Sequence, residues 1–190
     1  MEARHTHGQG TESRNFPLAS MPSLTTIFRD PNTNPHGTTV ERQAVRAVIF
    51  QGEQLLLVYS PVNRDYKFPG GGVKKGEKFE DALRRELLEE CGARLTRVVR
   101  EIGHIVEYAH AKEPEFETFK MTSHYFLCEA DTFVSPQTLE EYEAELDFQP
   151  AWVELAAALQ TNNSRIAQPD PPRWTTRDSF MLEYIKTHLL

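Results

Sequence analysis

The segment 77–91 has the clearest helical pattern in the chain, and it carries acidic residues on the face that a helix buries. At about 100° per residue, its apolar side chains share an arc of roughly 140° that must contact a core. These apolar residues are Phe79, Ala82, Leu83 and Leu87. Glu86 and Glu90 fall inside the same arc, and Glu89 lies just outside its edge.

Carboxylates in this position require a balancing cation, because burying one unpaired carboxylate costs several kcal/mol. Repulsion between like charges at i,i+4 and the negative end of the helix dipole each add up to about 1 kcal/mol. Residues 86, 89 and 90 are related by i+3 and i+4, so their oxygens can converge on one or two hard ions. Oxygen ligands favour Mg²⁺ or Mn²⁺ over zinc. The alternative is a solvated acidic face that Arg84 and Arg85 neutralise.

A glycine-rich loop directly precedes this helix. Its sequence, Phe68-Pro69-Gly70-Gly71-Gly72, excludes regular structure, because proline blocks a strand ladder and glycine permits positive φ. Glycines also let backbone amides and carbonyls approach a ligand closely. Since Mg²⁺ in proteins usually takes one or two carboxylates together with substrate phosphates, the loop and the acidic helix predict a centre for phosphate chemistry.

Hydrophobic alternation and turn residues predict the remaining elements. We expect a hairpin of strands 45–50 and 55–59 with a turn at 51–53, and a long hairpin of strands 97–108 and 119–128. The C-terminal part is predicted to contain helices at 139–146, 154–160 and 175–189 and a strand at 151–153. The helix at 77–91 is expected to have Gly76 as its N-cap and Gly92 as its left-handed stop.

Residues 1–40 differ in texture from the rest of the chain. They are rich in Ser, Thr, Asn, Gly and Pro and show no hydrophobic period, which predicts a poorly ordered N-terminal leader. Leu24, Ile27 and Phe28 could still dock on the body as a small strand. A chain of 190 residues is long enough for one domain with a substantial core, which we expect over residues 41–190.

Charge and cysteine usage limit the classes of function. The formal net charge of −7 argues against general electrostatic attraction for nucleic acid, so an anionic substrate must be bound by a local group of cations. No apolar run approaches the ~20 residues that span a bilayer, and no targeting segment is evident, so the expected compartment is the cytoplasm. Cys91 in a helix and Cys128 in a strand are both expected to be reduced thiols.

The order of the central segment resembles the Nudix box, the signature of the Nudix hydrolase family. It reads Gly71-x5-Glu77-x7-Arg85-Glu86-Leu87-Leu88-Glu89-Glu90-Cys91-Gly92-Ala93 and matches every fixed position. The one departure is Ala93, where the family usually has Ile, Leu or Val, and it affects packing only. The resemblance implies an α/β fold, the Nudix-type α/β/α sandwich with a mixed β-sheet.

The resemblance also implies roles for individual residues. Glu86, Glu89, Glu90 and the carbonyl of Gly70 would hold Mg²⁺ or Mn²⁺, and one carboxylate would serve as a base toward the attacking water. Arg85 would orient the carboxylates, and Glu77 would support the junction of loop and helix. Family members often recruit one more acidic residue from outside the box. Two groups are open for this role. The first is Glu113, Glu115 and Glu117; the second is Glu145 and Asp147, of which Glu145 is slightly favoured.

Other residues are candidates for contacts with the substrate. Arg46, Arg64 and Lys67 lie on or beside the strands expected to frame the cleft, and each is a candidate phosphate contact. Four aromatic residues are candidates for stacking on a base, although aromatic residues in strands more often pack in a core; they are Tyr66, Phe119, Tyr125 and Trp152. Three histidines have no evident partner and are interpreted as structural; they are His104, His110 and His124.

Three hypotheses for the function follow. The first is a Mg²⁺-dependent pyrophosphohydrolase that cleaves a phosphoanhydride of a nucleoside diphosphate linked to another moiety, in a nucleoside triphosphate, nucleotide sugar or dinucleotide. The second is an RNA 5′-pyrophosphohydrolase, against which the net acidity counts unless Arg46, Arg64 and Lys67 form a basic groove. The third is a regulatory nucleotide-binding module without turnover. Leu88 points away from the apolar face of its helix, which hints at a homodimer.

Overall fold

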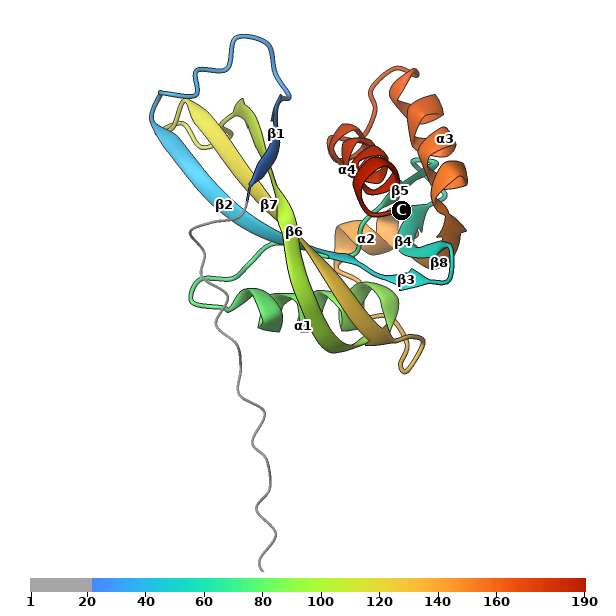
Figure 1. Ribbon diagram of the computed structural model, residues 1–190. Helices are drawn as coiled ribbons and strands as arrows, with labels where there is room; N and C mark the ends of the chain where they lie inside the picture. Colours follow the sequence, from blue (N-terminus) through green and yellow to red (C-terminus); the bar gives the residue numbers. More distant parts are fainter. Residues whose placement is uncertain (1–21) are drawn as a thin grey trace, which may run out of the picture.

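In the computed structural model of the chain, residues 22–190 are described, and their strands form two sheets (Figure 1). The first sheet, called sheet A, has the strand order β1-β6-β7-β2. Its strands are β1 (Ser23–Phe28), β6 (Arg94–His110), β7 (Thr118–Asp131) and β2 (Thr39–Val48). The pair β6–β7 is antiparallel, whereas β1–β6 and β2–β7 are parallel, so sheet A is mixed.

The second sheet, sheet B, is antiparallel and is built around β4 (Gln54–Ser60). This strand pairs with β3 (Phe50–Gln51), β5 (Asp65–Lys67) and β8 (Gln149–Glu154). Because β8 comes from the C-terminal part of the chain, the sheet joins segments about ninety residues apart, as the register Leu56↔Trp152 illustrates. The predicted strands 55–59, 97–108, 119–128 and 151–153 are therefore confirmed, each within a longer or equal strand.

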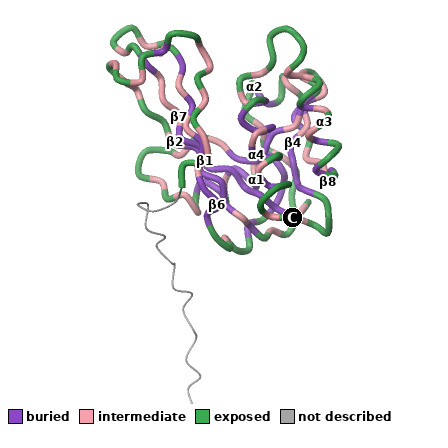
Figure 2. The backbone as a smooth tube through the Cα atoms, turned by 45° about the horizontal axis from the view of Figure 1, so that its top comes forward, coloured by how far each residue is buried: buried purple, intermediate pink, exposed green. Residues whose placement is uncertain are grey.

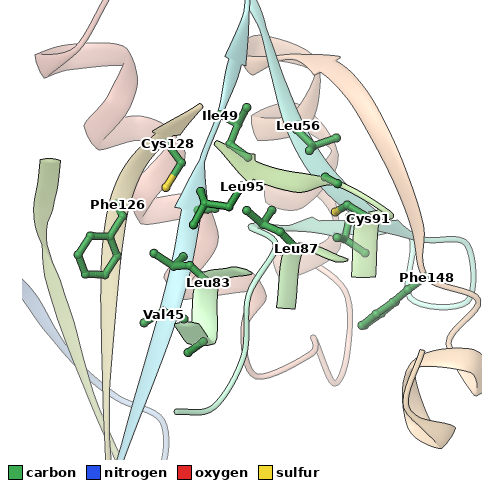
Figure 3. Packing of buried hydrophobic residues seen from close by; sticks show 14 residues of the cluster. Val45, Ile49, Leu56, Leu83, Leu87, Cys91, Leu95, Phe126, Cys128 and Phe148 are labelled. Carbon is green, nitrogen blue, oxygen red and sulfur yellow. The ribbon is translucent and has the colours of Figure 1, made fainter. Parts of the chain in front are cut away.

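Helices cover both faces of the sheets. The strand β4 shows this directly, because Leu56 and Val58 pack in the core beside α1 (Phe79–Cys91), whereas Leu55 and Leu57 pack in a second core. The second core contains residues of α3 (Leu155–Ile166) and α4 (Thr175–His188). The buried stretches of backbone gather in the middle of the molecule, around β2, β6, α1 and α4 (Figure 2). Figure 3 shows the first core, in which the apolar side of α1 lies against β2, β4 and β7. The predicted α/β/α sandwich with a mixed sheet is confirmed.

The predicted hairpin of strands 45–50 and 55–59 is wrong in its first strand. Residues 45–48 belong to β2, which pairs in parallel with β7 over ten residues in sheet A. The turn end of the hairpin is present: Phe50 and Gln51, in β3, pair with β4, and Leu56 N donates to Ile49 O at 3.0 Å. Because β2 pairs with β7 over ten residues, the apolar run 45–50 is divided between the two sheets, with residues 45–48 in sheet A and Phe50 in sheet B.

Part of the predicted leader is ordered. Residues 23–28 form β1, which pairs in parallel with β6, and Leu24 and Ile27 pack against the second core. The expectation that Leu24, Ile27 and Phe28 could dock on the body as a small strand is therefore confirmed, and the expectation of poor order does not hold for this segment. Residues 1–21 lie outside the described residues. The boundary at residue 41 stays a prediction.

The helix that carries the acidic residues begins later than expected. Its N-cap is Lys78, not Gly76, because Gly76 adopts a φ of 81° in a turn in which Glu77 N donates to Lys74 O at 2.9 Å. Its predicted stop is confirmed, since Gly92 has a φ of 57° and its N–H donates to Leu88 O. A left-handed residue at this position is the usual way for a helix to satisfy its last carbonyls.

The C-terminal helices follow the prediction with shifted ends. The predicted helix 139–146 appears as α2 (Glu141–Glu145), and α3 runs six residues beyond the predicted end at 160. Both cysteines are buried and unbonded, Cys91 in α1 and Cys128 in β7, as expected. Among the described helices, none is both long and apolar enough to cross a bilayer.

Candidate active site

A cleft of about 970 Å³ lies between sheet A and the C-terminal part of the chain. One wall comes from β2 and β7, and the other from α2, Phe148 and residues 173–177. The glycine loop, residues 70–77, lines the cleft between these walls. In Figure 1 the ends of β2, β6 and β7 that lie away from α1 are at the upper left, and α2 and α4 lie to the right of them. The loop predicted for phosphate chemistry thus lies in this cleft.

Two of the three helix carboxylates face this loop from inside the protein. Glu86 and Glu90 are 8% and 1% exposed, as the helical wheel predicts. The Gly70 N–H donates to Glu90 Oε2 at 2.8 Å. A Cβ atom added to Gly71 would lie 2.5 Å from Glu86 Oε1, so only glycine leaves room for this carboxylate. Burial raises the pKa of Glu86 above its usual value.

Lys67 supplies one of the cations that the buried carboxylates require. Its ammonium forms a buried ion pair with Glu90 Oε1, and the same nitrogen lies 4.6 Å from the ring centroid of Phe148. Burial of Glu90 raises the pKa of its carboxyl to about 7, and the nearby ammonium of Lys67 opposes this rise. Lys67, one of the three predicted phosphate contacts, therefore pairs directly with a carboxylate of the acidic helix.

Arg85 holds the outer carboxylates in place. It donates to Glu77 Oε1 at 2.9 Å, to Glu86 Oε1 at 2.6 Å and to Glu89 Oε2 at 3.2 Å. A further bond from Arg85 Nη2 reaches the carbonyl of Gly72 at 3.0 Å. The hydrogen bonds from Arg85 lower the pKa of Glu77 to about 2. One guanidinium thus joins the loop to the helix and pairs with Glu86 and Glu89, whereas Lys67 pairs with Glu90.

Arg46 reaches the loop from β2. The residue is 8% exposed and lines the cleft, and its Nη1 donates to the carbonyl of Gly70. Its buried Nε has no hydrogen-bond partner within the described part of the chain. Arg46 and Lys67 therefore lie in the cleft as the sequence predicted, one beside the Gly70 carbonyl and the other beside Glu90.

Two predicted site residues lie elsewhere. Arg64 is in the β4–β5 turn with a φ of 59°, and it lines a separate pocket with Arg165 of α3. The prediction that Arg64 frames the cleft is wrong, because the turn points toward α3. Glu145 is exposed on α2, and none of its described contacts reaches the box. The alternative acids lie in the β6–β7 connection, where Glu113 pairs with Arg42 of β2.

Glu143 is an acidic residue that the sequence reasoning missed. It is 3% exposed, accepts a hydrogen bond from the Tyr142 hydroxyl at 2.9 Å, and is close enough to raise the pKa of Glu90. Helix α2 has five residues, and its two neighbouring acids Glu141 and Glu145 are both exposed. A signal was present in the i+3 spacing of Glu140 and Glu143, which is typical of a capping box at a helix start.

The far part of the cleft carries cations from opposite ends of the sequence. Arg29, Arg42, Arg173 and Arg177 all line it. Their positions depend on the pairing of β1 with β6 and on the packing of α4, neither of which a local sequence pattern predicts. A local group of cations for an anionic substrate was nevertheless expected from the net charge.

The aromatic residues of the cleft differ from the predicted ones. The cleft is lined by Phe79, Tyr142, Phe148 and Trp174. Of the predicted stacking residues, Tyr125 is fully buried, Trp152 packs against the first core and Tyr66 against the second. Phe119 lies in a smaller pocket beside the cleft.

A second group of polar side chains lies on sheet A beside Phe79 of α1, whose ring centroid is 4.5 Å from that of His124. The ligand atoms of Glu101, His104 and His124 lie within 4.8 Å of one another. Both ring nitrogens of His124 are engaged, Nδ1 with Glu101 and Nε2 with Gln43, each at 2.8 Å. Burial lowers the pKa of His104. These hydrogen bonds give His124 the partner that the sequence did not show, and they agree with a structural role.

The donor set beside the glycine loop fits a hard divalent cation. It consists of oxygens only, from the carboxylates Glu86, Glu89 and Glu90 and the carbonyl of Gly70. Such ligands suit Mg²⁺ and Mn²⁺. The Glu86 carboxylate fills the space that a Cβ atom at Gly71 would take, so this donor lies directly against the loop.

Comparison with known families gives one match over most of the chain. The sequence model of the NUDIX domain matches residues 40–174, which include the loop, α1 and both strands of the long hairpin.

Individual relatives share less of the sequence. An RNA pyrophosphohydrolase from Bartonella bacilliformis is 29% identical over 110 residues, which are 51% of this chain and 62% of that protein. An RNA pyrophosphohydrolase from a Sulfurovum species is 35% identical over 69 residues, which are 35% of this chain and 44% of that protein. The matches thus span less than two thirds of the length of these relatives.

Solved structures with a similar arrangement are distant in sequence. A NUDIX hydrolase from Nitrosomonas europaea superposes with a TM-score of 0.47 at 20% identity, covering 73% of this chain and 88% of that one. A MutT protein from Bacillus halodurans superposes with a TM-score of 0.46 at 14% identity, covering 73% and 82%.

Proposed function

The chain belongs to the Nudix family, and on this premise we propose that it is a pyrophosphohydrolase. Its substrate would be a nucleoside diphosphate linked to a further group, as in a nucleoside triphosphate, a nucleotide sugar or a dinucleotide. One observation carries the proposal: the buried carboxylates Glu86 and Glu90 lie against the Gly70–Gly71 loop in a cleft that also contains Arg46 and Lys67. Cations next to an oxygen-only donor set suit a phosphate substrate.

Nudix hydrolases generally use divalent metal ions. In this chain Glu86, Glu89, Glu90 and the Gly70 carbonyl are the groups that would hold Mg²⁺ or Mn²⁺. When bound, such an ion neutralises phosphate charge and lowers the pKa of water. Of the cleft's cations, Arg46 and Lys67 lie beside these groups and are proposed to bind the phosphates.

Arg85 and Glu77 would act as positioning residues. Arg85 bonds to three carboxylates and to the Gly72 carbonyl, so its loss would release both the loop and the helix acids. Charge-assisted hydrogen bonds of this kind are about twice as strong as neutral ones. Glu77 in turn holds Arg85 through two bonds, at 2.9 and 3.0 Å.

Glu143 is proposed as the acid recruited from outside the box, in place of Glu145. Its support is the burial of Glu143 and its effect on the pKa of Glu90, whereas Glu145 is exposed. A carboxylate so close to Glu90 would add to the negative potential that attracts a divalent ion.

RNA with a 5′-diphosphate or 5′-triphosphate is a second candidate substrate. The relatives from Bartonella and Sulfurovum are named RNA pyrophosphohydrolases, which favours it. The net charge of −7 was the main objection, and arginines in the cleft answer it locally. The basic groove that the sequence required would then consist of Arg46, Lys67 and the arginines of the far wall, without Arg64.

The test is hydrolysis of a panel of nucleoside triphosphates, nucleotide sugars, dinucleoside polyphosphates and a short 5′-triphosphorylated RNA, with Mg²⁺ or with EDTA. Glu90→Gln and Glu143→Gln should each lower kcat/KM at least roughly 100-fold, while Glu141→Gln, an exposed neighbour on α2, serves as the matched control. A loss with Glu145→Gln instead of Glu143→Gln would reverse the choice of acid. Nucleotide binding without product under every condition would instead support the regulatory module.

Two further expectations remain proposals. The two unbonded thiols support a reducing compartment such as the cytoplasm. A homodimer is proposed through the outer face of α1, where Leu88 is 46% exposed. Sedimentation of the full chain measures whether it is a monomer or a dimer.

A further inference from the structure

A second, smaller pocket adjoins the cleft at the far end of sheet A. Its volume is about 190 Å³, and it shares Arg29, Arg42 and Arg173 with the cleft. Its remaining lining includes Lys112 and Phe119. We call it the distal pocket. Because three residues line both spaces, the distal pocket continues the cleft in which Arg46 and Lys67 lie.

The distal pocket has an excess of positive charge. Three arginines and Lys112 line it, against one acidic residue, Glu113. Glu113 pairs with Arg42 at 3.4 Å, but both side chains are substantially exposed, so this pair is weak. Within residues 22–190, Arg173 and Lys112 form no ion pair. The pocket is therefore locally rich in cations although the chain has a net charge of −7.

A buried chain of ion pairs holds the arginine at the junction of the two spaces. Arg29 donates through Nε to Glu107 Oε1 at 2.9 Å, and Glu107 also pairs with Arg177 at 3.3 Å. Arg177 bonds twice to Asp178, at 2.9 and 3.0 Å. The side chains of Glu107 and Arg177 are 0% and 3% exposed. Since buried charges are costly unless they are held in such pairs, Arg29 is fixed in position rather than free to sample the solvent.

An aromatic face lies beside these cations. The guanidinium of Arg42 lies 5.8 Å from the ring centroid of Phe119. A stacked guanidinium keeps its edge donors available for a phosphate while its plane rests on the ring. Moreover, Arg29 and Arg177 lie outside the residues that match the family, 40–174, so β1 and α4 bring them to the cleft as features of this chain.

We propose that the distal pocket binds a second phosphate of the substrate, one that is not part of the anhydride being cleaved. The proposal rests on the proposed function, because it places the reacting diphosphate at the glycine loop. The shared chemistry is a phosphate on the 3′ side of the first nucleotide. It could come from the phosphodiester of an RNA 5′ end or from the terminal 3′-phosphate of a small nucleotide.

The test measures binding, so it does not require turnover. Calorimetry on the full chain compares adenosine 5′-monophosphate with adenosine 3′,5′-bisphosphate and with the 5′-phosphorylated dinucleotide pApG. We expect at least one of the two larger ligands to bind about tenfold more tightly than the monophosphate, the gain of one charged contact. Arg173→Gln should reduce that gain several-fold, and it is an exposed residue whose replacement leaves the core intact. Arg97→Gln, an exposed cation paired with Glu129, is the matched control.

The two larger ligands separate the sources. A gain for pApG alone indicates the RNA phosphodiester, and a gain for the bisphosphate indicates a terminal phosphate. Equal affinities for all three ligands, or a gain that Arg173→Gln leaves unchanged, would overturn the proposal. A gain in binding together with no hydrolysis of any substrate in the panel would leave the distal pocket standing and remove the proposed function instead.

Discussion

Replacing Lys67 by methionine removes the cation that contacts Glu90, and we expect this change to lower the free energy of unfolding at pH 8 by about 1–2 kcal/mol, because pH 8 lies about one unit above the pKa of Glu90 and a carboxylate without its cation can bind a proton instead. The side chains of Lys67 and Glu90 are 7% and 1% exposed, so the carboxylate loses its ion pair without gaining water. Its remaining contact among the described residues is the Gly70 N–H at 2.8 Å, a bond worth about 1.5–3 kcal/mol that does not offset the burial of a charge. Methionine preserves the apolar stem, which separates the charge from the packing.

The pH dependence of the free energy of unfolding tests the Lys67–Glu90 ion pair in a second way. Folding raises the pKa of Glu90 from 4.5 to about 7, so the folded state holds the proton more tightly between these values, and this group lowers stability as the pH rises through that range. At pH 5 Glu90 is protonated whether or not Lys67 is present. The penalty of Lys67→Met should therefore be about 1 kcal/mol smaller at pH 5 than at pH 8.

Urea unfolding in EDTA at pH 5 and pH 8 measures both effects. The double variant Lys67→Met/Glu90→Gln should recover about 1 kcal/mol at pH 8 relative to the sum of the single variants, since it removes the buried charge as well as its partner. Lys186→Met, at an exposed lysine of α4, should stay within about 0.5 kcal/mol of wild type. A cost for Lys67→Met below about 1 kcal/mol that is the same at both pH values would refute a buried ion pair with Glu90.

Three further outcomes follow from local geometry. Glu77→Gln should lower the free energy of unfolding by roughly 1–3 kcal/mol at pH 7. Because Arg85 depresses the pKa of Glu77 to about 2, this difference from wild type should disappear as the pH falls from 4.5 toward about 2. Urea unfolding across this pH range measures the difference. Gly70→Ala should cost at least about 2 kcal/mol in the same assay, since Gly70 has a φ of 135° and an added Cβ would collide with β2, whereas Gly72→Ala meets nothing and should cost little. A thiol reagent at pH 8 should modify neither cysteine in the native chain and both in denaturant, because burial raises the pKa of Cys128 to about 12 and both thiols are buried.

The acidic helix could be predicted from the sequence because its geometry is local. The wheel that places Glu86 and Glu90 inward depends only on the period of 3.6 residues, and the structure buries both. The stop at Gly92 is local in the same way, since it depends on one residue that adopts positive φ at little cost. The Nudix box contains the same features at fixed spacings, because it includes the inward carboxylates of the helix and the glycine that ends it.

The walls of the cleft could not be predicted in this way. Arg64 lies in the β4–β5 turn, which carries it toward α3. Arg46 lies within β2, and the pairing of β2 with β7 holds it beside Gly70. Glu143 and Glu145 are two residues apart on one short helix, and only the packing of α2 decides which of them is buried. These outcomes depend on contacts between segments far apart in the chain.

The sequence alone therefore determined the chemistry of the site: an acidic helix, a glycine loop and the oxygen donors that they supply, all within one stretch of local structure. Only the tertiary structure decided which cations face those donors and where the cleft leads. Arg29 and Arg177 meet at Glu107 although they lie near opposite ends of the chain, because β1 pairs with β6 and α4 packs on the same sheet. The buried area and ion pairs that fix such contacts are properties of the whole fold, and no window of sequence contains them.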